Sequence, residues 1–114
     1  MNAEISWLVE LAVKPGQLDN FRALTGEMVE FSRREPGVLG YDRFVSEDGK
    51  LVYACERYAD SAAALDHLQT FEKKFSYRLL GMVDRRRFTV FGTPTDELKR
   101  RLDRFGATYL RLFV

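Results

Sequence analysis

VLGYDRFVSEDGKLVYACERY, residues 38–58, contains two strand-like segments on either side of one turn. Residues 38–45 and 51–58 are rich in Val, Tyr and Phe, which favour extended structure. Between them the Asp48-Gly49 pair suits the positive φ of a hairpin turn. The stretch therefore predicts two strands paired antiparallel.

The chain before this hairpin predicts a strand and then a helix. In residues 5–13 every odd position is apolar, from Ile5 to Val13, which is the period-two alternation of a half-buried strand. After Pro15-Gly16, apolar residues recur at three- and four-residue steps, as on one side of a helix. They are Leu18, Phe21, Leu24, Met28 and Phe31. We expect the odd face of the strand to meet the helices.

The chain after the hairpin predicts two more helices and two more strands. Asp60 or Ser61 provides an N-cap, and the following alanines favour a helix that extends to about Met82, straight or with a kink. Residues 87–91 predict a strand. Thr93-Pro94 is typical of a helix start, and residues 107–114 predict the last strand.

The order of elements predicts an α+β fold. Its first six elements, β-α-β-β-α-β, form the split βαβ pattern of the ferredoxin-like fold with an antiparallel sheet, to which a C-terminal helix and strand are added. Helices cover one face of such a sheet, but the apolar strand residues cannot all lie on that face. They include Leu8, Tyr41, Phe44, Val52, Tyr53 and Phe91. We therefore expect a homodimer in which a second copy covers the open face and receives the C-terminal strand.

The composition fits one small domain over residues 1–114. With 114 residues, 46% of them hydrophobic, the chain has enough apolar material for a single core. Its 18 Lys and Arg residues nearly balance its 17 Asp and Glu residues, so no net field would attract nucleic acid or an anionic membrane. Charged residues interrupt every apolar segment, which argues against a membrane-spanning helix.

Cysteine use and the N-terminal residues suggest a reducing compartment. Cys55 is the only cysteine, which excludes an internal disulfide and a multi-cysteine metal site. The first residues lack the basic segment and apolar run of a signal peptide. We expect a cytoplasmic protein that contains no metal.

Several short strings carry a resemblance when their order and spacing are taken together. They are Val13-Lys14-Pro15-Gly16, Glu35-Pro36-Gly37, Tyr41, Glu56-Arg57-Tyr58 and Ala64-Leu65-Asp66-His67-Leu68. Over roughly residues 5–91 the chain resembles the antibiotic biosynthesis monooxygenase family. One departure is that the family often has Trp where Tyr58 stands. The resemblance implies a dimeric α+β barrel.

The resemblance also implies a pocket between the sheet and the helices of each monomer. In that pocket some members oxygenate quinols or polycyclic phenols with molecular oxygen and without a metal or flavin. A related branch degrades haem with an Asn, a Trp and a His at the positions of Val9, His67 and Tyr77. Because the Asn and the haem-ligating His are missing, the resemblance implies neither haem nor another cofactor.

His67 and Tyr77 are the candidate catalytic residues. His67 is the only histidine, and its imidazole is suited to remove a phenolic proton and leave an anion that reacts with oxygen. The alternative is a structural hydrogen bond on an amphipathic helix. Tyr77 follows by ten residues, close to three turns at about 3.6 residues each, so an unbroken helix would place it on the same face.

Trp7, Val9, Phe71 and Phe75 are the candidate substrate-binding residues. Trp7 and Val9 share a strand face that should look toward the helices, and the two phenylalanines lie on the helix opposite. A plain aromatic core is the alternative, and it is favoured for the phenylalanines.

Two strand carboxylates leave a further alternative open. Glu10 and Glu56 each need a partner such as Arg43 or Arg57 if they are buried, and an ion pair is the favoured interpretation. If either one faces the pocket, desolvation would raise its pKa and make it a base in place of His67.

The resulting hypothesis is a cofactor-independent monooxygenase that acts on a small aromatic molecule, a quinol or polycyclic phenol, whose identity the sequence does not reveal. The rival hypothesis is a non-catalytic dimer that binds a small hydrophobic ligand or fills its pocket with its own aromatic side chains. The apolar residues are compatible with both hypotheses, so only the arrangement of the site can distinguish a monooxygenase from a non-catalytic binding protein.

Overall fold

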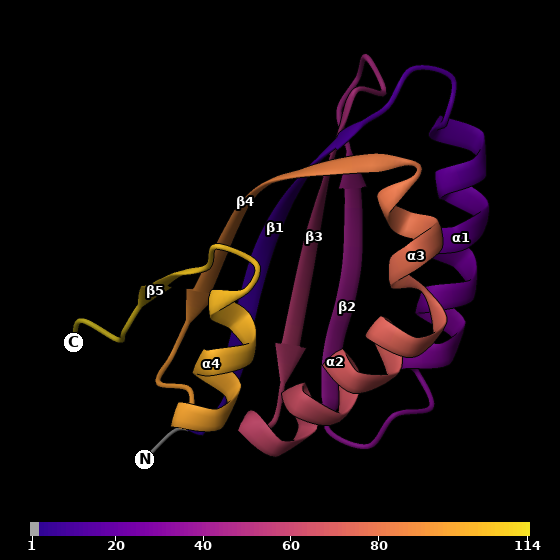
Figure 1. Cartoon of the computed structure of the whole chain (residues 1–114). Coiled ribbons are helices and arrows are strands. Elements are labelled where there is room, and N and C mark those ends of the chain that lie inside the picture. The colour runs from indigo at the N-terminus through magenta and orange to yellow at the C-terminus, as the bar shows by residue number, and fades with distance from the viewer. Residues whose placement is uncertain (1–2) are drawn as a thin grey trace.

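The computed structural model describes residues 3–114 and places one sheet against a layer of helices (Figure 1). In chain order the elements are β1 (Ile5–Val13), α1 (Leu18–Ser32), β2 (Val38–Val45), β3 (Leu51–Tyr58), α2 (Ser61–Lys74), α3 (Ser76–Leu80), β4 (Val83–Phe91), α4 (Asp96–Asp103) and β5 (Thr108–Leu110). The strand order is β2-β3-β1-β4-β5, antiparallel throughout except that β4 and β5 are parallel. This is the α+β ferredoxin-like architecture that the sequence predicts.

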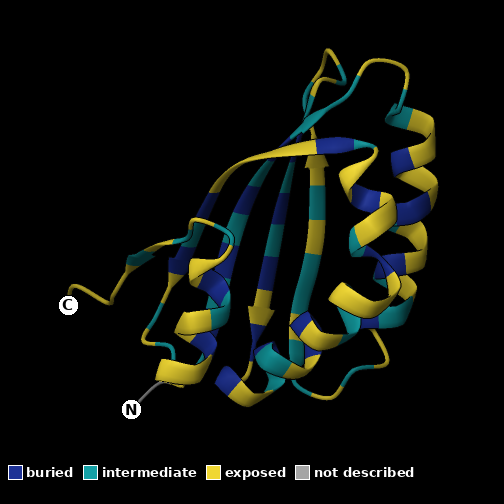
Figure 2. Ribbon diagram, in the orientation of Figure 1, coloured by how far each residue is buried: buried dark blue, intermediate teal, exposed yellow. Residues whose placement is uncertain are grey.

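β1 lies in the centre of the sheet and shows the predicted alternation. Its odd residues Ile5, Trp7, Val9 and Leu11 are buried beneath the helices, whereas the even residues between them are half-buried (Figure 2). Because the side chains of a strand point alternately to opposite faces, the same rule assigns the two faces of β3. Val52, Ala54, Glu56 and Tyr58 are the buried ones.

The helices begin and pack where the sequence predicts. In α1 the apolar stripe buries Phe21, Leu24 and Met28 against the sheet. At the start of α2 the Asp60 side chain accepts a hydrogen bond of 2.9 Å from the Ala63 backbone N–H, which satisfies a donor that the first turn leaves free. Both helices therefore hold their side chains over the central strands.

Three boundaries differ from the predictions. The long helix is broken at Phe75, whose backbone is non-helical, so α2 and α3 are separate. β4 begins at Val83, and a register shift against β1 leaves Arg86 as an extra residue that the period-two pattern does not anticipate. The last strand is shorter than predicted and lies in this chain's own sheet, because β5 pairs parallel with β4.

The face of the sheet opposite the helices carries apolar side chains. Leu8 pairs with Cys55 and Thr89 there, and Phe44 and Phe91 are 60% and 39% exposed. Tyr41 and Val52, by contrast, lie on the helix side. The prediction that apolar residues occupy both faces is therefore confirmed. Among residues 3–114, no helix is long and apolar enough to cross a membrane.

Candidate functional site

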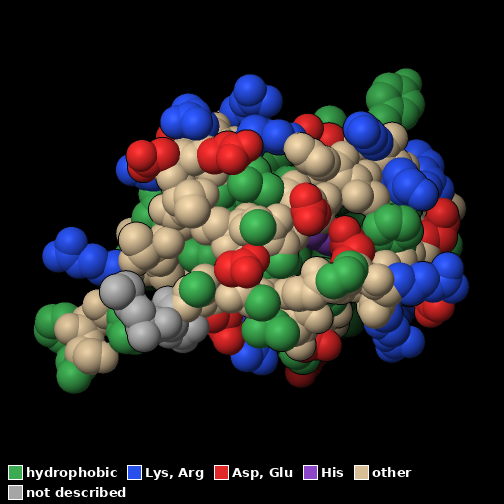
Figure 3. Space-filling view, turned by 90° about the horizontal axis from the view of Figure 1, so that it is seen from below, with side chains coloured by type: hydrophobic (Ala, Val, Ile, Leu, Met, Phe, Trp, Pro, Cys, Tyr) green, Lys and Arg blue, Asp and Glu red, His purple; other side chains and the backbone are tan. Residues whose placement is uncertain are grey.

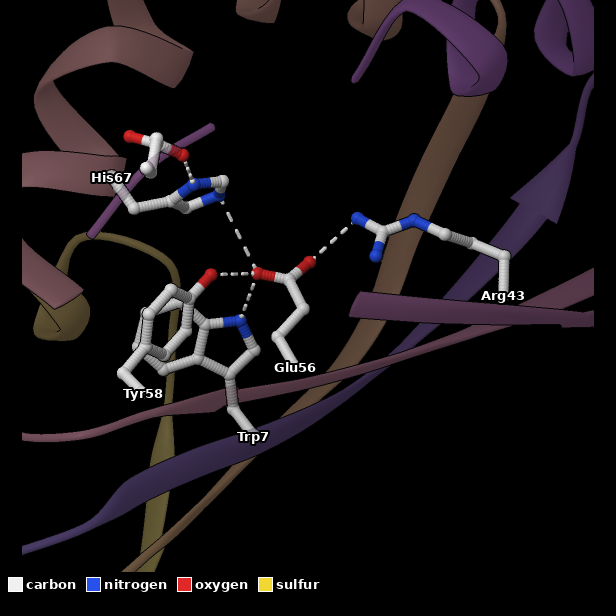
Figure 4. A network of polar contacts seen from close by, with 6 residues as sticks. Trp7, Arg43, Glu56, Tyr58 and His67 are labelled. Carbon is white, nitrogen blue, oxygen red and sulfur yellow. Dashed lines mark hydrogen bonds and ion pairs between the residues drawn. The ribbon is translucent and has the colours of Figure 1, made fainter. Parts of the chain in front are cut away.

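Glu56 lies at the centre of a buried polar network on the helix-covered face of the sheet (Figure 4). In the strand register it stands directly opposite Trp7 of β1 on one side and Tyr41 of β2 on the other. Arg43 lies two residues along β2 from Tyr41 and therefore projects from the same face. The sheet thus brings residues from three strands together.

Three donors satisfy the Glu56 carboxylate. Trp7 Nε1 donates a hydrogen bond of 2.9 Å to Oε1, and the Tyr58 hydroxyl donates to the same oxygen. Arg43 Nη2 donates to Oε2 at 2.6 Å, which also makes a buried ion pair. Since hydrogen bonds to a charged group contribute about 1.5–3 kcal/mol each, this carboxylate is held firmly in one orientation.

The network fixes the ionisation of its members. Burial alone would raise the pKa of Glu56, but the positive charge of Arg43, aided by His67 and the hydrogen bonds, outweighs it and lowers the pKa below its usual value. Burial and the neighbouring Glu56 carboxylate raise the pKa of Tyr58 well above its usual value. Glu56 is thus an ionised acceptor and Tyr58 a neutral donor. The favoured interpretation of Glu56 as a member of an ion pair is thus confirmed, with Arg43 as its partner, and the alternative of a raised pKa is wrong because Arg43 compensates the charge.

His67 of α2 lies between two carboxylates. Its Nδ1 is 2.7 Å from Oε1 of Glu35, which lies in the turn between α1 and β2, and its Nε2 is 3.6 Å from Oε1 of Glu56. The ring also packs against the rings of Tyr41 and Tyr58, each with a centroid distance of 5.2 Å. An Nδ1–H donated to Glu35 leaves Nε2, beyond hydrogen-bond distance of Glu56, as the free basic nitrogen.

An apolar cavity adjoins this network. The space open to the centres of water-sized molecules is about 60 Å³. Trp7, Glu56 and His67 line one part of it, and the remaining lining is mostly apolar. Viewed from below, the histidine side chain is visible among hydrophobic and acidic side chains (Figure 3), although His67 is only 6% exposed. A polar, ionisable group is therefore held at the wall of a mostly apolar space.

The structure brings four of the six predicted site residues together. Trp7, Val9, His67 and Phe71 all line the cavity. Trp7 and Val9 do so from β1, and His67 and Phe71 from α2.

The other two predicted site residues lie elsewhere. Phe75 is buried but packs edge-on against Phe31, with ring centroids 6.0 Å apart, away from the cavity. Tyr77 is 92% exposed. The expectation that Tyr77 borders the same space as His67 is wrong, because the helix break at Phe75 rotates α3 relative to α2.

The two strand carboxylates have different surroundings. Glu56 faces the cavity, whereas Glu10 accepts a hydrogen bond of 2.7 Å from the Tyr53 hydroxyl on the open face. Alternation in β3 would have assigned Glu56 to the buried face, since Ala54 and Tyr58 lie two residues away on either side and project from the same face of the strand. Sequence reasoning missed the role of Glu35, because nothing in a turn sequence predicts contact with a helix 32 residues away.

Metal coordination finds no support in the arrangement. Among residues 3–114, no group of three or more His, Cys, Asp or Glu side chains is placed to hold a metal ion. The donors described above are instead committed to one another. An ionisable imidazole next to charged groups and an apolar space can accept a proton and stabilise charge.

Comparison with known proteins gives one family and several similar structures. The model of the antibiotic biosynthesis monooxygenase family matches residues 5–74, which is more than half of the chain. None of the curated proteins compared with the chain by sequence matches it.

Three solved structures illustrate the similarity. MupZ from Pseudomonas fluorescens has a TM-score of 0.89 and 21% identity, covering 99% of this chain and 93% of MupZ. SnoaB from Streptomyces nogalater, a cofactor-independent oxygenase, has a TM-score of 0.70 and 16% identity over 82% of this chain and 95% of SnoaB. A Bacteroides thetaiotaomicron protein described under the same family name is 32% identical over 71% of this chain and 80% of its own, with a TM-score of 0.66. The first two identities support the fold alone.

Proposed function

Because the chain belongs to the antibiotic biosynthesis monooxygenase family, we propose that it oxidises a planar, ionisable aromatic molecule such as a quinol or polycyclic phenol with molecular oxygen. The reaction uses no metal or organic cofactor. One observation carries the proposal: an imidazole lies between two carboxylates at the wall of an apolar cavity. The relationship of fold to SnoaB, a cofactor-independent oxygenase, supports the class of reaction.

The first step is transfer of the substrate's proton to His67 Nε2. Glu35 accepts the Nδ1–H, so the ring keeps the tautomer in which Nε2 is basic. The imidazolium that forms is stabilised on one side by Glu35 and on the other by Glu56.

The second step is the reaction of the substrate anion with oxygen. The anion donates one electron to O₂, and the resulting radical and superoxide combine to form a carbon–oxygen bond. For the keto form of an anthrone-like phenol, the peroxide takes back the proton held by His67 and loses water, so that the ring CH₂ group and O₂ become a carbonyl and H₂O. A mostly apolar cavity supports this step, because the electron-rich anion is less stabilised by water there.

Trp7, Val9 and Phe71 supply the walls against which a flat substrate stacks. The enclosed space of about 60 Å³ is small for a molecule of several rings, so side chains must shift when a substrate enters. Phe71, which is only partly buried, is the wall with most room to move. We also propose that the protein acts as a homodimer, whose second copy covers the open sheet face.

An oxygen electrode with a panel of quinols and anthrone-like compounds tests the proposal. We expect oxygen uptake with at least one compound, none with its methyl ether, which has no proton to transfer, and roughly a hundredfold lower turnover in His67→Gln. Gln is chosen because it nearly preserves the volume of this buried side chain. If compounds bind but none is oxidised, the proposal is wrong and the non-catalytic ligand-binding hypothesis takes its place.

A further inference from the structure

We propose that Arg43 is a substrate-anchoring residue, whose Nη1 binds an oxygen atom of the ligand, and that this pocket therefore selects aromatic molecules carrying a carbonyl, phenolate or carboxylate oxygen. The inference rests on the proposed function only in placing the ligand in the same cavity. It concerns recognition, and its test requires no turnover.

The guanidinium of Arg43 is held in one position, but one of its nitrogen atoms makes no hydrogen bond within residues 3–114. Nη2 donates to Glu56 at 2.6 Å, and the guanidinium carbon lies 3.5 Å from the centroid of the Tyr41 ring. The side chain is only 9% exposed. Its Nη1 is buried and has no hydrogen-bond partner among the described residues. Buried donors in proteins are almost always satisfied, so an unused one in a fixed position calls for an acceptor.

The position of Arg43 points to a ligand as that acceptor. Arg43 lines the central cavity and also a second hollow between α1 and β2, and Phe21 is the other residue shared by both. An elongated ligand that reaches from one space into the other therefore passes the guanidinium. In the close-up view only one nitrogen of the guanidinium is joined to Glu56 by a dashed line (Figure 4).

Charge limits the chemical class of this ligand. Nη1 donates hydrogen bonds and accepts none, so the matching group is an oxygen with a free lone pair. A charged donor such as the Arg43 guanidinium forms stronger hydrogen bonds with an ionised oxygen than with a neutral one. Apolar walls accommodate the rest of the molecule.

The test compares binding of 2-naphthoate, 2-naphthol and naphthalene to the wild-type protein and to Arg43→Lys by calorimetry. Lys retains a positive charge for Glu56 but has no second planar nitrogen to replace Nη1. We expect wild type to bind naphthoate roughly ten- to a hundredfold more tightly than naphthalene, and Arg43→Lys to lose most of that preference while retaining its naphthalene affinity. Arg34→Lys, an exposed arginine paired with Glu30, is the matched control and should bind like wild type.

Equal affinity of wild type for naphthoate and naphthalene overturns the inference, as does an unchanged preference in Arg43→Lys. Failure to bind any of the three probes overturns it together with the proposed function. Oxygen uptake without any preference for naphthoate overturns the inference alone. If Arg43→Lys does not fold, a crystal structure of wild type with naphthoate decides: the carboxylate must lie within hydrogen-bond distance of Nη1.

Discussion

Trp7 and Glu56 face each other directly across the β1–β3 register, and Trp7 Nε1 donates a hydrogen bond of 2.9 Å to the carboxylate. The pair couples the aromatic wall of the cavity to its charged centre. Since Trp7 also packs against the tilted ring of Tyr58 with ring centroids 4.7 Å apart, the indole is fixed from two directions. The wall on which a substrate would stack is therefore preorganised.

Trp7→Phe should lower the free energy of unfolding by about 1.5–3 kcal/mol, because a buried carboxylate loses one of its three donors. Urea unfolding followed by circular dichroism measures this, since the variant has no tryptophan to fluoresce. Tyr53→Phe is the control: its hydroxyl donates a hydrogen bond to Glu10 on the open face, where solvent competes, so its loss should destabilise the protein less than Trp7→Phe does. Equal losses in the free energy of unfolding of the two variants would show that burial does not strengthen the hydrogen bonds of the network.

Glu56→Gln should destabilise the protein by about 3–5 kcal/mol at pH 7, because Arg43 is left buried without its counter-charge. The pKa of Glu56 is lowered on folding, with Arg43, His67 and Tyr58 facing the carboxylate. A lowered folded pKa contributes stability that is present above the usual value of about 4.3 and is lost as pH falls through the folded value. Melting curves at a series of pH values should therefore show the gap between variant and wild type narrowing in acid. A difference in melting temperature that stays constant with pH would contradict a lowered pKa of Glu56 in the folded protein.

Glu35→Gln should lower turnover roughly tenfold while leaving KM little changed, because Glu35 orients His67 without touching the substrate. Glu30→Gln, on the exposed surface of α1, is the control. A Glu35 variant that loses stability but keeps its rate would assign the residue a purely structural role.

The fold could be predicted because its signals are local and periodic. Alternation in residues 5–13 and the Asp48-Gly49 turn specify strands and register without reference to the rest of the chain. The position of the break at Phe75 could not be predicted, because the residues around it favour a helix and allow a kink anywhere along it.

The candidate site was only partly predictable for a related reason. Parity along a strand places Trp7 and Glu56 on one face, but which donors compensate the carboxylate depends on neighbours 13 and 49 residues away in sequence. The pKa of Glu56 depends on those neighbours and not on burial alone. The sequence therefore indicated an ion pair for Glu56, but it did not identify Trp7, Tyr58 and His67 as the other neighbours of the carboxylate.

Tyr77→Phe should leave turnover and melting temperature unchanged within error, although spacing from His67 first suggested a catalytic role. The side chain is 92% exposed, and the break between α2 and α3 turns it away from the cavity. Oxygen-uptake assays on the purified variant measure this. A tenfold loss of rate would mean that Tyr77 reaches a site in the assembled protein that one copy alone does not complete.

The open sheet face predicts a homodimer at micromolar concentration, measured by sedimentation equilibrium. Phe44 is 60% exposed there, and at the C-terminus Leu112 and Phe113 are 81% and 98% exposed, so a single copy leaves apolar surface in water. An interface that covers the sheet should bury at least about 2,000 Å² in total, the range of obligate dimers.

Phe44→Glu places a charge in that interface and should shift the protein to monomer, whereas Leu80→Glu, at a similarly exposed position on the helix side, should remain dimeric. Deleting residues 111–114 tests the C-terminal segment separately and should weaken the dimer, because the deletion leaves β5 in the sheet but removes the exposed apolar side chains beyond it. A wild-type monomer defeats the prediction outright. A dimer that survives Phe44→Glu but dissociates in Leu80→Glu would move the interface to the helix side of the molecule.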